Sequence, residues 1–377
     1  CPRLVPPLAS ARLMICDRIA RRLAETDVQR IAVIKPSALG DVVQSLPVLG
    51  VLAERFPDAR VSWVIGDSLS ELVEDHPHLD ESLVYRRRGG WSAWHRLLHE
   101  LRDGRFDLVF DLQGLLRTGL MTRATGASIR IGLESAREGS GWACHGLLED
   151  TGPTVPAHRR YWRIAEFLGL GHLRPDATIA IPSSERAWSD VMMRQLGENV
   201  VALHAGSRWE TKRWGVEQFA AVGAHAIREH GAAVVLVGSS QERILTARLK
   251  ELIVGQAPGG RVENLAGQTG LKKLAAVLES VDALVTNDSG PMHLAAAMGT
   301  GVVGVFTCTS ARRSGPPAGQ HVLVETGVSC GGSYHRRCPF RGDRHMACLR
   351  DVSAREVCRG LDRLLDAAQP SVRRDVA

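Results

Sequence analysis

Short apolar runs alternate with helical patterns along most of this chain, and this alternation restricts the possible folds more than any other feature. The runs resemble buried parallel strands, which are apolar on both faces. The candidate strands are residues 30–35, 60–66, 106–114, 199–207, 232–240, 283–290 and 301–307. Strands that alternate with helices predict an α/β protein with parallel sheets and right-handed crossovers.

The length of the chain, 377 residues, exceeds one ordinary core and indicates two α/β domains. Pro182, Ser183 and Ser184 favour a hinge, so the boundary is expected near residue 183. Both halves are expected to be Rossmann-like and doubly wound, with ligands in a cleft that faces the carboxyl ends of both sheets. The expected segments are an N-terminal extension with an amphipathic helix at 1–29, domains at 30–183 and 184–355, and a C-terminal helix and tail at 356–377.

Composition excludes several classes of protein. Apolar residues make up 44% and charged residues 23% of the chain, as in ordinary soluble domains. No apolar run approaches the roughly 18 residues that span a bilayer, and no secretory leader is visible, so a cytoplasmic monomer is expected. The net charge of +6 favours anionic partners, but no signature of a nucleic-acid module accompanies it.

The stretch IAVIKPSALGDVVQ, residues 31–44, has the layout of a phosphate-binding loop, with a strand, a turn and an amphipathic segment. Its turn nevertheless holds a single glycine, Gly40, followed by Asp41. A carboxylate at the mouth of such a loop would repel a phosphate. Asp41 either caps a helix that Pro47 kinks, or it performs chemistry of its own.

The segment ALVTNDSGPMHLAAAMG, residues 283–299, predicts a helix N-terminus at the carboxyl end of a strand. Asp288 or Ser289 can cap the helix, Gly290 permits close approach of the backbone, and Pro291 suits an early helical position. Such an N-terminus is a ready anion site, although a well-capped crossover helix without a ligand explains the same residues.

Two further loops follow strands of the second half. LHAGSRWETKRW, residues 203–214, offers Ser207 and Lys212, whose point charge suits a diphosphate. Glu242 follows the next strand, where acids of nucleotide sites reach a ribose hydroxyl or simply begin a helix. No G-x-G-x-x-G, P-loop or Asp-x-Asp pattern occurs, so a diphosphate would be neutralised by lysine, arginine and helix amides.

These motifs resemble those of the bacterial glycosyltransferase family 9, the ADP-heptose:lipopolysaccharide heptosyltransferases. The similarity covers about residues 30–355 and includes SALGDVVQSLPVL, DLQGLLRTGL, IGLESARE, HRRYWRIAEFLGL, HAGSRWETKRW, NLAGQTGLKKLAAVL and TNDSGPMHLAAAMG. The resemblance implies a two-domain GT-B fold. It also implies inverting, metal-independent transfer of heptose from ADP-heptose to a lipopolysaccharide inner-core acceptor. No cofactor is expected, and the enzyme is expected in the cytoplasm, at the surface of the inner membrane.

The resemblance also implies roles for individual residues. Asp41 corresponds to the catalytic base. The residues that correspond to the nucleotide-sugar site are Ser207, Lys212, Glu242, Thr269, Asp288, Ser289, Gly290 and His293. A different nucleotide-sugar donor or acceptor, and a non-catalytic protein that binds a nucleotide sugar or glycan, are the alternatives.

Two groups of residues carry weaker expectations. Arg117 and Arg123 could meet the anionic groups of a glycolipid acceptor, or they could be solvated surface residues. Cys330, Cys338 and Cys348 gather late in the chain with spacings that fit no standard zinc pattern. We expect structural thiols there in preference to a metal site.

Overall fold

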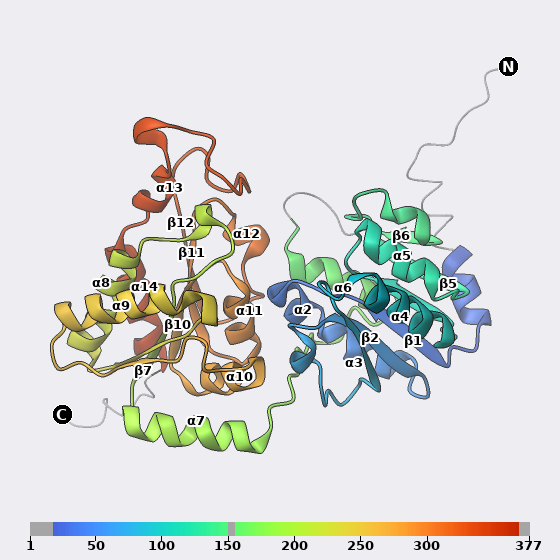
Figure 1. Ribbon diagram of the computed structural model, residues 1–377, viewed down its shortest axis with the longest axis horizontal. Helices are drawn as coiled ribbons and strands as arrows, with labels where there is room; N and C mark the ends of the chain where they lie inside the picture. Colours follow the sequence, from blue (N-terminus) through green and yellow to red (C-terminus); the bar gives the residue numbers. More distant parts are fainter. Residues whose placement is uncertain (1–17, 150–154, 369–377) are drawn as a thin grey trace. The chain divides into compact units, whose positions relative to one another are not determined.

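The computed structural model describes residues 18–149 and 155–368, which form two compact units that divide between Ala180 and Ile181 (Figure 1). Residues 18–25 are helical, and Ile19 and Leu23 are buried on one side of this helix. The rest of the predicted N-terminal amphipathic helix, residues 10–17, lies outside the described residues.

The first unit contains a six-stranded parallel sheet in the order β3-β2-β1-β4-β5-β6. Its strands are β1 (Arg30–Ile34), β2 (Arg60–Gly66), β3 (Glu81–Tyr85), β4 (Leu108–Asp111), β5 (Ile129–Leu133) and β6 (Gly146–Leu148). The central strand β1 pairs with β2 and β4, and its residues from Ile31 to Ile34 are fully buried. Burial on both faces explains why this strand reads as a continuous apolar run.

Helices cover both faces of this sheet. The helices are α2 (Leu39–Ser45), α3 (Pro47–Arg55), α4 (Gly90–Asp103), α5 (Leu116–Ala124) and α6 (Ala157–Phe167). Leu97, Leu101 and Met121, from α4 and α5, pack in one core cluster with residues of β1, β2 and β4. The bend predicted at Pro47 lies at the junction of α2 and α3, where Leu46 keeps helical backbone angles and Pro47 is the first residue of α3, so its missing N–H costs no hydrogen bond.

The second unit repeats this architecture with the strand order β12-β11-β10-β7-β8-β9. Its strands are β7 (Val200–His204), β8 (Ala233–Leu236), β9 (Val262–Asn264), β10 (Ala283–Asn287), β11 (Gly301–Phe306) and β12 (His321–Glu325). All the pairings are parallel, and β7 and β10 lie side by side in the centre. The doubly wound α/β fold predicted from the alternation of strands and helices is therefore confirmed for both units.

The helices of the second unit also form two layers. They are α7 (Ser183–Leu196), α8 (Val216–His230), α9 (Arg243–Gln256), α10 (Leu271–Ser280), α11 (Gly290–Ala297), α12 (Ala311–Ser314), α13 (Ala347–Asp351) and α14 (Ala354–Ala368). On one face, α8, α9 and α14 share a core cluster with the central strands (Figure 1). Val357 and Leu361 place the C-terminal helix inside this core.

The strands that sequence reasoning missed lie toward the sheet edges. β3, β5, β6, β9 and β12 are short or only partly buried, so their apolar runs are interrupted by polar residues. The stretch before α7, residues 177–182, is extended but pairs with no strand. Pro182 directly precedes α7 as its N-cap residue, and the two compact units divide at Ala180 and Ile181.

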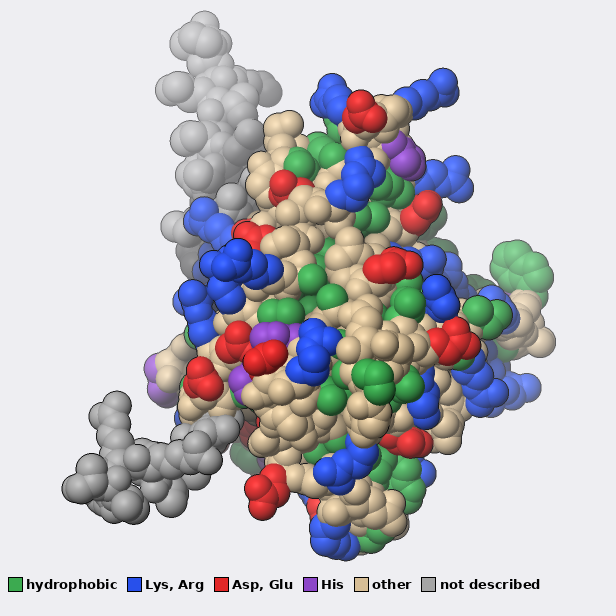
Figure 2. Space-filling model, turned by 90° about the vertical axis from the view of Figure 1, so that its left-hand side faces the viewer, with side chains coloured by type: hydrophobic (Ala, Val, Ile, Leu, Met, Phe, Trp, Pro, Cys, Tyr) green, Lys and Arg blue, Asp and Glu red, His purple; other side chains and the backbone are tan. Residues whose placement is uncertain are grey.

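Charged side chains of both signs are interspersed over the face that Figure 2 presents, with small hydrophobic areas between them. Within residues 18–149 and 155–368, no helix combines the length and the apolar character needed to cross a bilayer.

The position of Leu361 in α14 gives a direct test of the second core. Leu361 is fully buried, so Leu361→Ala should lower the free energy of unfolding by about 2–5 kcal/mol. Arg363, on the exposed side of the same helix, supplies the matched control, and Arg363→Ala should change that free energy by less than about 0.5 kcal/mol. Urea unfolding followed by circular dichroism measures both. Equal stability of the two variants would contradict the packing of α14 in the core.

Candidate active site

The strand order of the second unit leaves a crevice at the carboxyl ends of β7 and β10. The crossovers from β7 lead toward β8 and β9, whereas β10 begins the opposite half of the sheet. Connections that diverge from neighbouring strands leave room between them, and ligands of open α/β sheets bind there. Ser207, Lys212, Asp288, Ser289 and Gly290 all follow one of these two strands.

His204 joins the two strands at this point. It is the last residue of β7, and its Nδ1 lies 3.3 Å from Thr286 Oγ1 and 3.1 Å from Ser289 Oγ. Ser289 is the N-cap residue of α11, but its side chain makes no capping hydrogen bond. Ser289 therefore occupies the predicted N-cap position, but the predicted capping hydrogen bond is wrong, because the Ser289 hydroxyl contacts His204 instead. No side chain among the described residues caps the N-terminus of α11, and Pro291 occupies its first turn as predicted.

Lys212 and Asp288 form an ion pair across the same crevice. Lys212 Nζ donates to Asp288 Oδ2 at 2.7 Å, and both side chains are largely buried. The ammonium also lies 4.7 Å from the centre of the Trp209 ring. The sequence suggested that Asp288 could cap α11. Its carboxylate instead forms an ion pair with Lys212, the lysine that follows β7. The ammonium carries three donors, and this contact uses one of them.

Asn287 fixes the loop that carries Ser207 and Lys212. Its Nδ2 donates to the carbonyl oxygens of Ala205 at 2.8 Å and Gly206 at 3.3 Å. Its Oδ1 accepts from the backbone N–H of Trp214 at 3.1 Å. One buried amide therefore satisfies backbone groups at both ends of the loop, which would otherwise be costly to bury. Sequence analysis did not identify this function of Asn287.

Glu242 lies against Gly206, in the loop after β7, where a side chain would displace its carboxylate. Its Oε1 lies 3.8 Å from His204 Nε2, and its Oε2 accepts from the N–H and hydroxyl of Ser239 at 2.7 and 2.8 Å. A Cβ at Gly206 would meet Glu242 Oε1 at 1.6 Å. Burial alone would raise the pKa of Glu242, but the nearby His204 imidazole and the hydrogen bonds from Ser239 lower it to about 2. The carboxylate is therefore charged and held in place at neutral pH.

The remaining expected nucleotide-sugar residues lie at the same edge of the sheet or next to it. Thr269 is in the loop between β9 and α10, one residue before the N-cap Gly270, and is partly buried. His293 lies in the first turn of α11 and is buried. Ser207 is also buried, and its carbonyl oxygen accepts from Arg213 Nε at 2.7 Å.

Asp41 occupies the corresponding edge of the first unit. It is in the first turn of α2, directly after the loop that follows β1. Its Oδ1 accepts from the hydroxyl of Tyr161 at 2.9 Å, and its Oδ2 accepts from the N–H of Ala38 at 3.4 Å. The sequence left capping and chemistry as alternatives for Asp41. The two oxygens divide between a backbone contact at the start of the helix and a contact with α6, far away in the sequence.

Two buried charges that sequence analysis missed lie beside Asp41. Lys35 directly follows β1, and its Nζ donates to the carbonyl oxygen of Leu112 at 3.2 Å. Burial lowers the pKa of Lys35, and the carboxylates of Asp41 and Asp111 oppose this effect. The ammonium also lies 4.8 Å from the centre of the Tyr161 ring. Lys35 therefore contacts both Leu112, just after β4, and Tyr161, the hydrogen-bond partner of Asp41.

Asp111, the last residue of β4, is anchored by its own loop. It accepts hydrogen bonds from the N–H groups of Gln113 and Gly114 and from the hydroxyl of Thr118, all at 3.0 Å. Burial raises its pKa, whereas these bonds lower it. A charged residue at the end of a buried strand was the available signal for both Lys35 and Asp111. Their contacts could not be read from the sequence because they join different strands.

The two arginines expected near an acceptor are not brought together. Arg117 lies in the first turn of α5 and is partly buried, whereas Arg123 lies in the last turn and is exposed. Six residues along a helix correspond to a rise of about 9 Å. Arg117 is therefore the one at the carboxyl edge of the sheet.

The late cysteines are free thiols. Cys348 is buried, and its pKa is raised by burial and by the neighbouring Cys330, Cys308 and Cys338. Cys338 Sγ accepts from the N–H of Met346 at 3.3 Å. The expectation of structural thiols in this segment stays a prediction.

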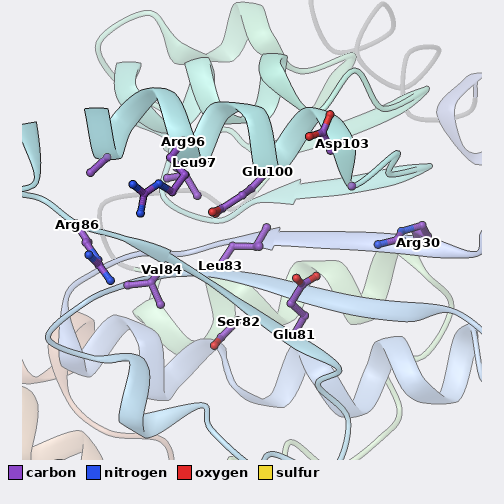
Figure 3. Close-up of a pocket in the computed structure, with 12 residues that line it drawn as sticks. Arg30, Glu81, Ser82, Leu83, Val84, Arg86, Arg96, Leu97, Glu100 and Asp103 are labelled. Carbon is purple, nitrogen blue, oxygen red and sulfur yellow. The ribbon is translucent and has the colours of Figure 1, made fainter. Parts of the chain in front are cut away.

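A surface hollow of about 560 Å³ lies elsewhere in the first unit, between β3 and α4 (Figure 3). Residues of both charges line it, among them Glu81, Arg86, Arg96 and Glu100. The residues that line this hollow do not include Asp41, Lys35 or Asp111. Its position beside an edge strand separates it from the crevice at the carboxyl ends of β1 and β4.

Comparison with known proteins assigns the chain to a family. A family profile described as glycosyltransferase family 9 (heptosyltransferase) matches residues 94–342. The chain belongs to this family. This membership confirms the resemblance found in the sequence, and the protein is a glycosyltransferase.

Individual relatives of this family 9 glycosyltransferase cover most of its length. The chain is 26% identical to the lipopolysaccharide core heptosyltransferase OpsX of Haemophilus influenzae over 76% of this chain and 81% of that protein. It is 28% identical to lipopolysaccharide heptosyltransferase 1 of Pseudomonas aeruginosa over 83% and 88% of the two chains. The solved structure of the ADP-heptose lipopolysaccharide heptosyltransferase II of Escherichia coli matches with a TM-score of 0.72 at 22% identity, over 90% and 99% of the two chains. The last match shows the fold, which is the GT-B fold of two α/β domains.

The close approach of Glu242 to Gly206 predicts a strong effect of one methyl group. Gly206→Ala should displace the Glu242 carboxylate and lower the free energy of unfolding by about 1–3 kcal/mol, since a buried charged acceptor loses its partners. Thermal unfolding of purified variants measures this change.

Gly255, in α9, is the matched control because a Cβ there meets nothing within 4 Å. Gly255→Ala should stabilise the protein by about 0.5–1 kcal/mol, as expected for a helical glycine. A Gly206→Ala variant as stable as the wild-type protein would show that Glu242 does not occupy this position.

Proposed function

We propose that this family 9 glycosyltransferase transfers heptose from ADP-heptose to an inner-core acceptor of lipopolysaccharide, with inversion at the anomeric carbon. Family membership and the names of the relatives support heptosyl transfer. The single observation that carries the mechanism is the division of chemistry between the units. A fixed carboxylate lies at the switch point of one sheet, and a lysine with an uncapped helix N-terminus lies at that of the other.

Asp41 acts as the general base in this proposal. An inverting transfer needs one carboxylate that takes the proton of the acceptor hydroxyl while its oxygen attacks the anomeric carbon from the face opposite the leaving ADP. Tyr161 and the N–H of Ala38 orient the two oxygens of Asp41. Lys35 lies near Asp41, and this carboxylate opposes the lowering of the lysine pKa by burial.

The loops after β7 and β10 bind the diphosphate of the donor in this proposal. Lys212 supplies a positive charge, and the N–H groups at the start of α11 from Gly290 onward supply donors next to Ser289. Because Asp288 already neutralises part of the lysine charge, the helix amides carry much of the stabilisation of the leaving group. We propose that these groups act without a metal ion and without a cofactor.

The remaining expected residues complete the donor site. Ser207, Thr269 and His293 lie on loops or helix starts around the crevice, and the charged Glu242 carboxylate can accept a hydrogen bond from a ribose hydroxyl. We propose that residues 184–355 bind the nucleotide sugar and that residues 30–183 bind the acceptor. Arg117, at the carboxyl edge of the first sheet, is the better placed of the two arginines for an anionic glycolipid at the cytoplasmic membrane surface.

Asp41→Asn tests the base directly. Asparagine retains an oxygen that accepts from Ala38 but cannot take a proton, so the rate of transfer should fall by about 10²- to 10⁴-fold. ADP release in the presence of ADP-heptose and an inner-core acceptor measures the rate. Isothermal titration with ADP should give an unchanged Kd, because Asp41 is not part of the donor site.

Tyr161→Phe is the graded control, since it removes one hydrogen bond to Asp41 and leaves the carboxylate. It should slow transfer by about tenfold, the effect of losing one charged hydrogen bond. Unchanged transfer by the Asp41→Asn variant would refute the assignment of the base. Turnover with another nucleotide sugar but none with ADP-heptose would favour a different donor, and donor binding without any turnover would favour a binding protein.

A further inference from the structure

Two histidines and one aspartate converge on the helical face of the second unit. His225 Nε2 lies 2.7 Å and His230 Nε2 lies 2.8 Å from the same atom, Asp362 Oδ1. The two imidazole rings are 5.8 Å apart between centres and nearly perpendicular. One potential ligand atom from each of these three side chains lies within 4.8 Å of the other two. Among the described residues, no other group of three His, Cys, Asp or Glu side chains meets this condition.

The convergence does not follow from helical spacing alone. His225 and His230 are both on α8 and are five residues apart, which places them about 140° apart around an ideal helix. Their rings nevertheless turn to one point between α8 and α14, where Asp362 lies. Packing of the two helices fixes that point, because Phe219 of α8 and Leu361 of α14 belong to one core cluster.

The cluster lies between the core of the second unit and its surface. His230 is the last residue of α8, and its carbonyl oxygen accepts from Asn199 Nδ2 at 3.0 Å. The side chains of His225 and His230 are 22% and 15% exposed, and that of Asp362 is 33% exposed. The ligand atoms are thus shielded on the core side and reachable from solvent, as a site that exchanges an ion must be.

We propose that His225, His230 and Asp362 bind a zinc-class divalent transition-metal ion, with water completing a tetrahedral site. Neutral imidazole nitrogens and one carboxylate oxygen are ligands that Zn²⁺ prefers, at about 2.0–2.2 Å. Ligand atoms around a tetrahedral ion lie about 3.4 Å apart at those bond lengths, so each ring moves back by about 0.6 Å to admit the ion. The three side chains are partly exposed, so rotation about their side-chain torsions accommodates such a shift.

The ion would be structural and separate from the proposed transfer reaction. His230 ends α8 just before β8, and Asn199 directly precedes β7, so the cluster lies at the amino ends of the strands. Lys212 and Ser289 follow the carboxyl ends of β7 and β10, at the opposite edge of the same sheet. A metal ion there would join the C-terminal helix α14 to α8 and would stabilise the second unit without contacting the donor.

Metal titration of the full chain, purified without a polyhistidine tag and freed of metal by chelator, tests the proposal. Isothermal titration with ZnCl₂ should show one site that His230→Gln and Asp362→Asn each weaken at least tenfold. Zn²⁺ should also raise the Tm of the wild-type protein and leave that of the variants unchanged. His99→Gln, an exposed histidine on α4 of the first unit, should behave as the wild type.

Cobalt distinguishes this site from the cysteines. Co²⁺ bound by His225, His230 and Asp362 gives visible bands without a thiolate charge-transfer band, whereas binding by Cys330, Cys338 or Cys348 gives that band. Asp362→Asn retains an oxygen that accepts from both histidines, so it keeps the test informative if a histidine variant fails to fold. Zinc isotherms that are identical in wild type and Asp362→Asn, or a thiolate band in the wild type, would overturn the proposal.

Discussion

The order of the strands in each sheet is the constraint on which both candidate sites depend. In each unit the first strand lies in the centre: the next two strands run outward on one side of it, and the chain then crosses to its other side and runs outward there. This arrangement opens a crevice at the carboxyl ends of β1 and β4, and another at those of β7 and β10. Lys35 and Asp41 come after β1 and lie at the first crevice. Lys212 comes after β7 and Ser289 after β10, and both lie at the second.

Charge is distributed differently in the two crevices. In the first, Lys35 is buried among the carboxylates of Asp41 and Asp111, so each charge offsets the cost of burying the others. In the second, Lys212 is paired with Asp288, and the start of α11 offers backbone donors that no side chain caps. The first arrangement suits a carboxylate that must stay ionised and oriented. The second suits an anion that must arrive and leave.

The sequence predicted the central part of this structure and little of its edges. Continuous apolar runs identified β1, β2, β4, β7, β8, β10 and β11, because burial on both faces leaves no polar interruption. The edge strands escaped because their burial is partial. The positions of Asp41 and Lys212 could be predicted, since each lies a few residues after such a run.

What the sequence could not supply is contact between distant residues. Tyr161 reaches Asp41 across 120 positions, and Asn287 fixes the loop at Gly206 from another strand. Ser289 and Asp288 were expected to cap α11, but both have partners on the β7 side, His204 and Lys212. Local capping rules fail there because contacts across the switch point satisfy the same side chains. The close approach of Glu242 to Gly206 likewise joins two loops, and no local pattern reveals it.

We propose that one carboxylate, Asp41, serves a single displacement at the anomeric carbon. The anomeric configuration of the transferred sugar, determined by NMR of the product and of the ADP-sugar consumed, tests that claim most directly. A single displacement predicts that the new glycosidic bond has the configuration opposite to that of the donor. Retention of the donor's configuration would require a second displacement and would contradict the role assigned to Asp41.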